Sequence, residues 1–196
     1  LIPQLTRRNV LAMTYVSGSP IDTLIDLPQA ERDRIMSALF ELMFMEFFEL
    51  KLVQTDPNFA NYQYRHNSGE IVLLDFGATR RFKAGFVNNY KKLVRAALVG
   101  DTQKLLAAAE RLGYSVAAAD EAYRELVLEF LLLALEPVCA DGDYDFARSS
   151  MARNIAQLAT DIGSFREHWQ APPAEAIYFH RKVGGMFMLA SRLKAR

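Results

Sequence analysis

Two short segments of the 196-residue chain carry side chains that can bind a divalent cation. The first is Asp56-Pro57-Asn58-Phe59-Ala60-Asn61, and the second, which starts fourteen residues after Asn61 and ends an apolar run, is Asp75-Phe76-Gly77. A phosphoryl group in transfer carries negative charge on its oxygens, so a protein that catalyses the transfer must hold Mg²⁺ across the phosphates and orient the attacking group. Because carboxylate and amide oxygens suit Mg²⁺, the two segments together predict a phosphoryl-transfer site.

The three polar residues of these segments differ in the role that they can take. Asp75 offers a carboxylate to bridge Mg²⁺, and Asn61 offers a neutral carbonyl oxygen that adds no negative charge beside the phosphates. Asp56 then remains free to position or deprotonate an acceptor. Asp, Pro and Asn also form ordinary turns, and Asp75 alone could cap a following helix. The presence of both segments, in this order, favours the metal site over that alternative.

Composition limits the classes of protein to consider. The chain is 51% hydrophobic, which fits one globular domain or one lobe of a two-lobe protein. Lys and Arg number 23, as do Asp and Glu, which argues against a nucleic-acid partner and leaves small-molecule and lipid partners open. The single cysteine fits a reducing compartment, and the sequence shows no signal peptide and no apolar run long enough to cross a membrane. Because no initiator Met is present, we interpret the chain as a fragment.

The first part of the chain is expected to form one strand and one long helix. Residues 9–16 are strand-like in composition and end in a turn cluster, and a short helical turn is expected over 20–25. Pro28 is suited to the first turn of a helix that covers 29–52. That helix is apolar almost all round, which predicts a buried helix at the centre of the domain.

A β-hairpin is predicted between the two acidic segments, and helices after them. Residues 62–64 and 71–74 flank a turn signal, and the open end of this hairpin would bring Asn61 and Asp75 together. Everything after Gly77 is expected to be helical. The expected helices cover 86–97, run from the cap Asp101 to Gly113 and from Asp120 to Pro137, cover 147–163, and run from Pro172-Pro173 to about Arg192.

Four segments resemble the UbiB, or AarF-domain, family of atypical kinases. They are 10–18 (VLAMTYVSG), 54–61 (QTDPNFAN), 74–78 (LDFGA) and 180–185 (HRKVGG). The resemblance covers essentially the whole chain and implies a mainly α-helical, protein-kinase-like C-terminal lobe with a small β-hairpin at the catalytic loop, the N-terminal lobe being absent from this chain. It divides the chain into a hinge strand and linker (1–27), a central helix with catalytic loop and DFG motif (28–82), and a helical remainder (83–196).

The resemblance also implies roles for individual residues. By it, Asp56 is the catalytic-loop aspartate, Asn61 and Asp75 bind the metal, and backbone groups of Met13-Thr14-Tyr15-Val16 contact adenine. The implied cofactors are Mg²⁺ and ATP or ADP. Because this family is associated with ubiquinone (coenzyme Q) biosynthesis and lipid homeostasis, the resemblance implies a small-molecule, lipid or quinone-related substrate and quinone-synthesis proteins as partners. The implied location is peripheral to a membrane, on its cytoplasmic or matrix side.

Five basic residues are candidates for contacts with phosphates or lipid headgroups. They are Arg80, Arg81, His180, Arg181 and Lys182. For the first two the alternative is a solvated pair at a helix start, and for the other three it is a solvated helix surface. The neighbouring Gly184-Gly185 pair costs roughly 1 kcal/mol per glycine in a helix, which predicts that another backbone packs closely against that face.

Three functions remain open from the sequence. The first is an atypical kinase or ATPase, in which the chain alone is expected to be inactive because the lysine and Gly-rich loop of the other lobe are missing. The second is a nucleotide-dependent scaffold that binds ATP and metal without turnover. The third is a small-molecule phosphotransferase, which is disfavoured because those relatives usually carry His where this chain has Gln54. The absence of an HRD arginine argues against regulation by a phosphorylated activation loop, and the absence of an Ala-Pro-Glu segment argues against a protein substrate.

Overall fold

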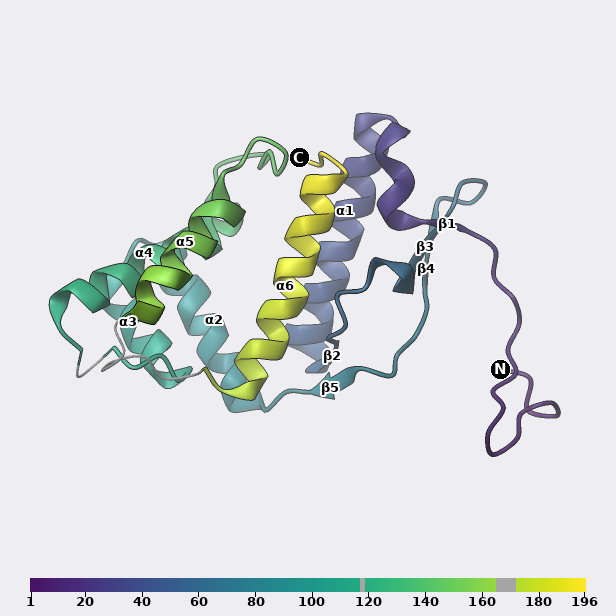
Figure 1. The fold of residues 1–196 in the computed structure, drawn as a ribbon, viewed down its shortest axis with the longest axis horizontal. Helices are drawn as coiled ribbons and strands as arrows, with labels where there is room; N and C mark the ends of the chain where they lie inside the picture. The colour runs from purple at the N-terminus through teal and green to yellow at the C-terminus, as the bar shows by residue number, and fades with distance from the viewer. Residues whose placement is uncertain (117–118, 165–171) are drawn as a thin grey trace.

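Helices make up most of the computed structural model, which describes residues 1–116, 119–164 and 172–196 (Figure 1). In chain order the elements are β1 (Ser19–Pro20), the 3₁₀ helix η1 (Ile21–Asp26), α1 (Gln29–Phe44), the π-helix η2 (Met45–Leu50), β2 (Leu52–Gln54), the 3₁₀ helix η3 (Phe59–Asn61), β3 (Tyr62–Arg65), β4 (Glu70–Leu73), β5 (Thr79–Arg81), α2 (Ala84–Leu98), α3 (Thr102–Arg111), α4 (Glu121–Cys139), α5 (Met151–Ser164) and α6 (Ala174–Arg192). The predicted mainly helical class with a small β-hairpin is confirmed.

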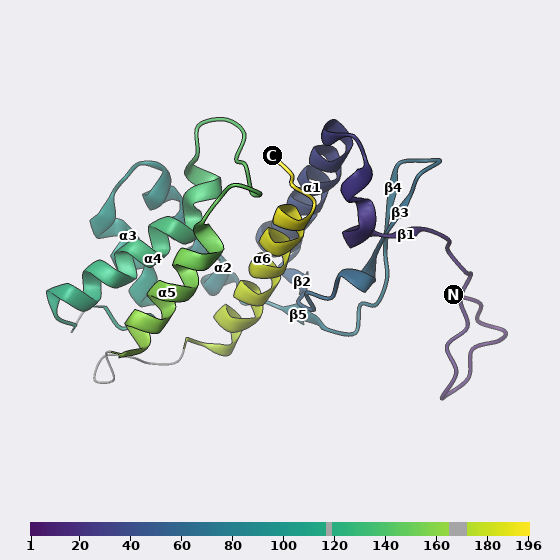
Figure 2. The ribbon, with the colours of Figure 1, turned by 45° about the horizontal axis from the view of Figure 1, so that its top comes forward.

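The helices α1 and α6 lie side by side although they are far apart in the sequence (Figures 1 and 2). Apolar side chains of α1, such as Ile35 and Leu39, share a buried cluster with Met186 and Leu189 of α6. This cluster also takes in the aromatic face of the hairpin through Tyr62. Burial of these side chains, each worth roughly 1.5–3 kcal/mol, holds the two helices together as one support.

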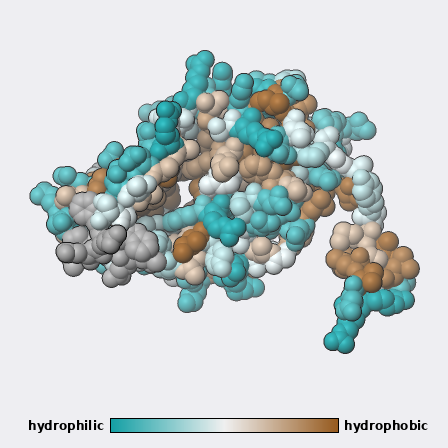
Figure 3. All heavy atoms as spheres, in the orientation of Figure 1, coloured by the Kyte–Doolittle hydropathy of each residue, from teal (hydrophilic) through white to brown (hydrophobic). Residues whose placement is uncertain are grey.

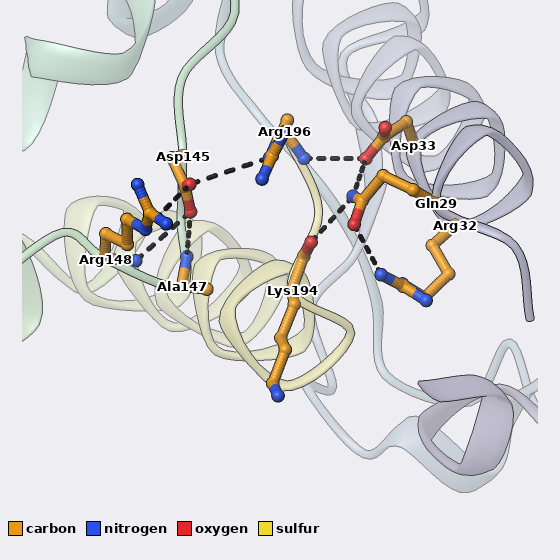
Figure 4. A network of polar contacts seen from close by, with 8 residues as sticks. All are labelled: Gln29, Arg32, Asp33, Asp145, Ala147, Arg148, Lys194 and Arg196. Carbon is orange, nitrogen blue, oxygen red and sulfur yellow. Dashed lines mark hydrogen bonds and ion pairs between the residues drawn. The ribbon is translucent and has the colours of Figure 1, made fainter. Parts of the chain in front are cut away.

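Polar contacts fix the end of α6 to the start of α1 (Figure 4). Gln29 donates to the backbone carbonyl of Lys194 at 2.8 Å, and the backbone N–H of Arg196 donates to Asp33 at 2.7 Å. Arg196 also lies 3.6 Å from Asp145, which precedes α5. The C-terminal residues are therefore tied to two other parts of the fold, and α6 is held at that end.

A second apolar cluster is centred on Phe47 of η2. The Phe47 ring stacks on Phe179 of α6 at a centroid distance of 3.7 Å and meets Phe82 and Tyr90 edge to face. Residues of α2, α3 and α4 complete this cluster. Because α6 supplies side chains to both clusters, it is the element that joins the two parts of the core.

Two small antiparallel sheets lie beside α1. The first has the order β1-β3-β4, with Tyr62 opposite Leu73 at the open end of the hairpin. The predicted hairpin is therefore confirmed, and Arg34 of α1 donates to the carbonyl of Gly69 in its turn at 2.9 Å. The second sheet pairs β2 with β5, with Gln54 opposite Thr79. The expectation that everything after Gly77 is helical is wrong at β5.

The expected strand at 9–16 is also wrong. In the described chain this segment has only an isolated bridge between Arg7 and Val10, and Figures 1 and 2 show it extending away from the body. Met13 and Tyr15 are 54% and 88% exposed, so their apolar side chains find no surface to pack against. A strand needs a hydrogen-bonding neighbour, and composition alone does not supply one.

The helix boundaries agree in most places with the prediction. Asp101 and Asp120 cap α3 and α4 through their side chains, and Gly113 follows α3 with a φ of +95°. Pro137, however, lies inside α4, which continues to Cys139, because a proline in the last turn removes only one hydrogen bond. The helix expected over 29–52 changes into η2 at Met45, and its apolar surface is not buried all round.

Candidate active site

The two acidic segments adjoin the paired strands β2 and β5. The Asp56 segment follows β2, and the Asp75 segment precedes β5. The π-helix η2 ends at Lys51, whose φ of +53° turns the chain into β2. Beyond the last strand pair, the backbone N–H and the hydroxyl of Thr55 both donate to the carbonyl of Ala78, at 3.3 and 2.8 Å. The loop of residues 54–61, called here the Asp56 loop, is thereby fastened to the loop of residues 74–78, called the Asp75 loop.

The buried side chain of Gln54 joins the two loops. Its amide nitrogen donates to the backbone carbonyl of Asp75 at 3.2 Å, and its amide oxygen accepts the backbone N–H of Asp56 at 3.0 Å. Gln54 is only 6% exposed, so both contacts are shielded from water. One carboxamide therefore fixes the distance between the two aspartates at the backbone.

Asp56 and Asn61 are in direct contact. The Asn61 side-chain nitrogen donates to one carboxylate oxygen of Asp56 at 2.9 Å, and the backbone N–H of Asn58 donates to the other at 3.3 Å. Asn58 in turn caps η3 by accepting the N–H of Ala60 at 3.0 Å. Because the amide nitrogen of Asn61 faces Asp56, its amide oxygen is left for another partner. An amide oxygen is a ligand atom that Mg²⁺ accepts.

Asp75 has a left-handed backbone, with a φ of +50°. Its carboxylate accepts the N–H of Gly77 at 2.8 Å, and a Cβ at Gly77 would lie 3.0 Å from that oxygen. A non-glycine residue in this region stores strain of order 1 kcal/mol or more, and Asp is among the residue types that adopt it most readily. Gly77 therefore allows the exposed carboxylate of Asp75 to fold back over its own loop.

The donor set fits Mg²⁺ held together with phosphates. Asp75 supplies a carboxylate and Asn61 an amide oxygen, and Mg²⁺ is usually bound by one or two carboxylates together with substrate phosphates and water. Within the part of the chain that the structure describes, no group of three or more His, Cys, Asp or Glu side chains has the arrangement of a metal site.

A buried ion pair lies beneath the Asp56 loop. Lys182 of α6 is 3% exposed, donates to the hydroxyl of Tyr62 at 2.6 Å and lies 3.6 Å from the carboxylate of Glu46. Burial raises the pKa of Glu46, while Lys182 and a backbone hydrogen bond from Gln54 oppose that rise. Together with Tyr62, the ion pair connects η2, β3 and α6 next to the Asp56 loop.

The Asp56 loop also rests directly on α6. A Cβ built on Gly185 would lie 2.6 Å from the Cβ of Pro57 and 3.4 Å from its Cα, so only glycine permits this approach. The predicted close packing is confirmed at Gly185. At Gly184 it is wrong, because a Cβ there would meet no described atom within 4 Å.

The three residues His180, Arg181 and Lys182 do not share one surface. His180 contacts the hydroxyls of Tyr90 and Tyr114, and burial lowers the pKa of its ring to about 4. Arg181 is exposed, whereas Lys182 is buried in the ion pair. The alternative of a solvated helix surface is therefore wrong for Lys182.

Arg80 and Arg81 lie on β5, so the alternative of a pair at a helix start is wrong as well. The guanidinium of Arg80 lies 3.6 Å from the centre of the Tyr178 ring of α6, a cation–π contact that holds β5 against this helix. The hinge residues Met13-Thr14-Tyr15-Val16 lie in the exposed N-terminal segment, away from the two loops (Figure 1).

Residues 1–109 match the family model of the ABC1 atypical kinase-like domain. The match includes the Asp56 loop, the Asp75 loop and the strands that join them. The chain belongs to the ABC1 atypical kinase family. The sequence resemblance to UbiB kinases is thereby confirmed.

Curated relatives of this ABC1 chain are named as atypical kinases. The rat protein named atypical kinase COQ8B, mitochondrial, is 34% identical over 195 residues, which are 100% of this chain and 37% of that protein. The yeast (Saccharomyces cerevisiae) atypical kinase COQ8, mitochondrial, is 31% identical over 198 residues, with 100% of this chain and 39% of that protein covered. The chain thus spans well under half the length of these relatives.

A solved structure supports the fold of the ABC1 chain. The complex of Rv3197 with erythromycin from Mycobacterium tuberculosis superposes with a TM-score of 0.66 at 20% sequence identity, covering 92% of this chain and 45% of that one.

Among the described residues, no helix combines the length and apolar character that crossing a membrane requires.

Sequence reasoning missed three supporting residues of the site. Gln54 was given no structural role, although its carboxamide can bond both loops. Glu46 was assigned to no role, and its partner Lys182 was considered only for phosphate or headgroup contacts. The available signal was the position of Glu46 inside the apolar run 43–48, which indicates a buried carboxylate; Lys182 follows His180 and Arg181 and carries no such signal.

Proposed function

We propose that this chain is the C-terminal lobe of an atypical kinase or ATPase that uses ATP and Mg²⁺ and acts in support of ubiquinone biosynthesis. The observation that carries the proposal is the Gln54 carboxamide, which hydrogen bonds to the backbones of Asp56 and Asp75 and so sets two acidic loops beside each other. Positioned groups on two neighbouring loops are what phosphoryl transfer requires.

The proposed division of labour follows from the contacts of each side chain. Asp75 and Asn61 would hold Mg²⁺, which neutralises charge on the β- and γ-phosphates. Asp56, whose carboxylate is held by Asn61 and by the N–H of Asn58, would orient the attacking hydroxyl or water and accept its proton. Backbone groups of residues 13–16 would contact adenine at the junction with the other lobe.

The proposed substrate is a small molecule or lipid related to quinones, met at a membrane surface. The chain passes from the Asp75 loop through β5 to α2 within a few residues, which leaves little room for a segment that would dock a peptide. The names of the curated relatives, atypical kinase COQ8 and COQ8B, support a role beside quinone-synthesis proteins. Arg81 and Arg181 are exposed and remain candidates for phosphate or headgroup contacts.

The test is isothermal titration of Mg²⁺-ATP and Mg²⁺-ADP into the full-length protein that contains this chain, combined with a phosphate-release assay. Asp75→Asn should abolish metal-dependent binding and turnover, because it removes the charged ligand. Asp141→Asn is the matched control, since this exposed aspartate lies in the loop between α4 and α5. Tight binding without turnover would instead favour a scaffold, and no binding would refute the nucleotide site.

A further inference from the structure

An apolar cavity of about 510 Å³ lies between α1, α2, α4, α5 and α6. Its walls are aromatic and aliphatic side chains, among them Phe44, Phe48, Leu131, Leu135 and Val183. None of the described residues that line it is Asp, Glu, Lys or Arg. Figure 3 shows brown, apolar residues in the recess between the α4–α5 pair and α6. Among the residues that the structure describes, the lining of the cavity is therefore lipophilic and free of Asp, Glu, Lys and Arg side chains.

One part of the wall carries neutral polar groups. The ring nitrogen of His180 lies 3.2 Å from the hydroxyl of Tyr114 and also contacts the hydroxyl of Tyr90. Burial lowers the pKa of His180 to about 4 and raises that of Tyr114 to about 12, so all three groups are uncharged near neutral pH. They can exchange hydrogen bonds with a hydroxyl or carbonyl group, but they cannot compensate an ionic one.

The cavity is separate from the candidate active site. The helix α6 forms the wall between them, with Gly185 against Pro57 of the Asp56 loop and Gly184 open to the cavity. Successive residues of a helix lie about 100° apart around its axis, so the adjacent residues Gly184 and Gly185 lie on different faces of α6. A ligand in the cavity would therefore not occupy the space of the nucleotide.

We propose that this cavity binds a neutral, largely apolar small molecule whose single hydroxyl or carbonyl group meets His180 and Tyr114. The volume lies in the range of small-molecule sites, roughly 300–1,000 Å³, and the lining has their usual character of apolar walls with a few polar groups. An apolar occupant gains contacts with side chains that otherwise face a void. A carboxylate or ammonium ion would lose its water without gaining a partner.

The test uses the fluorescence of N-phenyl-1-naphthylamine, a neutral apolar probe, with the full-length protein. We expect saturable binding, displacement by dodecan-1-ol, and at least tenfold weaker displacement by dodecanoate, the charged chain of the same length. Displacement should leave the titration of Mg²⁺-ADP unchanged. No probe binding, or equal displacement by the alcohol and the carboxylate, would overturn the proposal.

The site is located with Gly184→Phe, because a side chain at this position enters open space. The variant should bind the probe at least tenfold more weakly and unfold at the wild-type temperature or above. Gly163→Phe is the matched control, since residue 163 is also a helical glycine with no described atom near its Cβ position and lies outside the cavity. Ala134→Phe narrows the opposite wall and should have the same effect as Gly184→Phe. Wild-type affinity in both cavity variants would refute the assignment.

Discussion

Replacing Gly185 by alanine tests whether α6 positions the Asp56 loop. The added Cβ would lie 2.6 Å from the Cβ of Pro57, whereas non-bonded carbon atoms normally approach to about 3.5–4.0 Å. Pro57 has a rigid ring and directly follows Asp56, so relief of the overlap requires the loop to move by roughly 1 Å. Such a displacement of a positioned group lowers the rate by on the order of 100-fold.

The effect of Gly185→Ala on stability should be much smaller than its effect on rate. Overpacking costs about 1–3 kcal/mol, and the better helix propensity of alanine offsets about 1 kcal/mol of it. The free energy of unfolding is therefore expected to fall by about 0–2 kcal/mol, which leaves the protein folded at 25 °C.

Turnover of ATP by the full-length protein, followed by phosphate release, measures the effect on rate, and urea unfolding measures the effect on stability. Gly163→Ala is the control, because its Cβ meets no described atom within 4 Å and it lies outside both sites. It should keep wild-type turnover. If Gly185→Ala also keeps wild-type turnover, the contact with Pro57 does not position Asp56 and the reasoning is refuted.

Three further outcomes concern the buried polar groups. Lys182→Met should lower the free energy of unfolding, measured in urea at pH 7, by about 3–5 kcal/mol, because Glu46 loses its cation. Adding Glu46→Gln to this variant should restore most of the lost stability. A loss below about 1 kcal/mol in Lys182→Met would contradict the ion pair. The pKa of His180 is lowered to about 4 in the folded protein, so the unfolded chain takes up the proton first as the pH falls. The contribution of His180 to the free energy of unfolding is therefore complete above about pH 6.5. It falls by up to about 3 kcal/mol toward pH 4. His180→Gln should flatten this part of the curve of unfolding free energy against pH, and an unchanged curve would show that the ring titrates normally. Gln54→Ala should lower turnover about 10- to 100-fold in the phosphate-release assay, since it frees both loops, and full activity would rule out the bridge.

Local signals in the sequence predicted local structure well. The hairpin of β3 and β4 has a turn signal between two short apolar runs, and the caps Asp101 and Asp120 use side chains that bond within three residues. In each case the signal and the structure lie within a few residues of each other.

Features that depend on distant partners were not predicted. The strands β2 and β5 are three residues long and lie more than twenty residues apart, and neither carries a strand pattern of its own. Residues 9–16 carry such a pattern, but among the described residues their backbone pairs only with the nearby residues Ile2 and Arg7 and not with either sheet. The bridge of Gln54 depends on the pairing of β2 with β5, and the pair of Glu46 with Lys182 depends on the return of α6 to the Asp56 loop.

The position of α6 has a consequence for truncated forms of this protein. The helix lies wholly outside residues 1–109, yet Lys182 and Gly185 support the Asp56 loop. A premature stop codon or deletion in the last quarter of the chain would keep both acidic segments and all the residues that match the family model, and would remove the surface on which the Asp56 loop rests. Such a product would still be scored as an intact kinase-like sequence, although Glu46 would hold an unmatched charge and Ile35 and Leu39 would face water. For shortened gene products of this family, the presence of α6 is thus a better guide to function than the presence of the motifs.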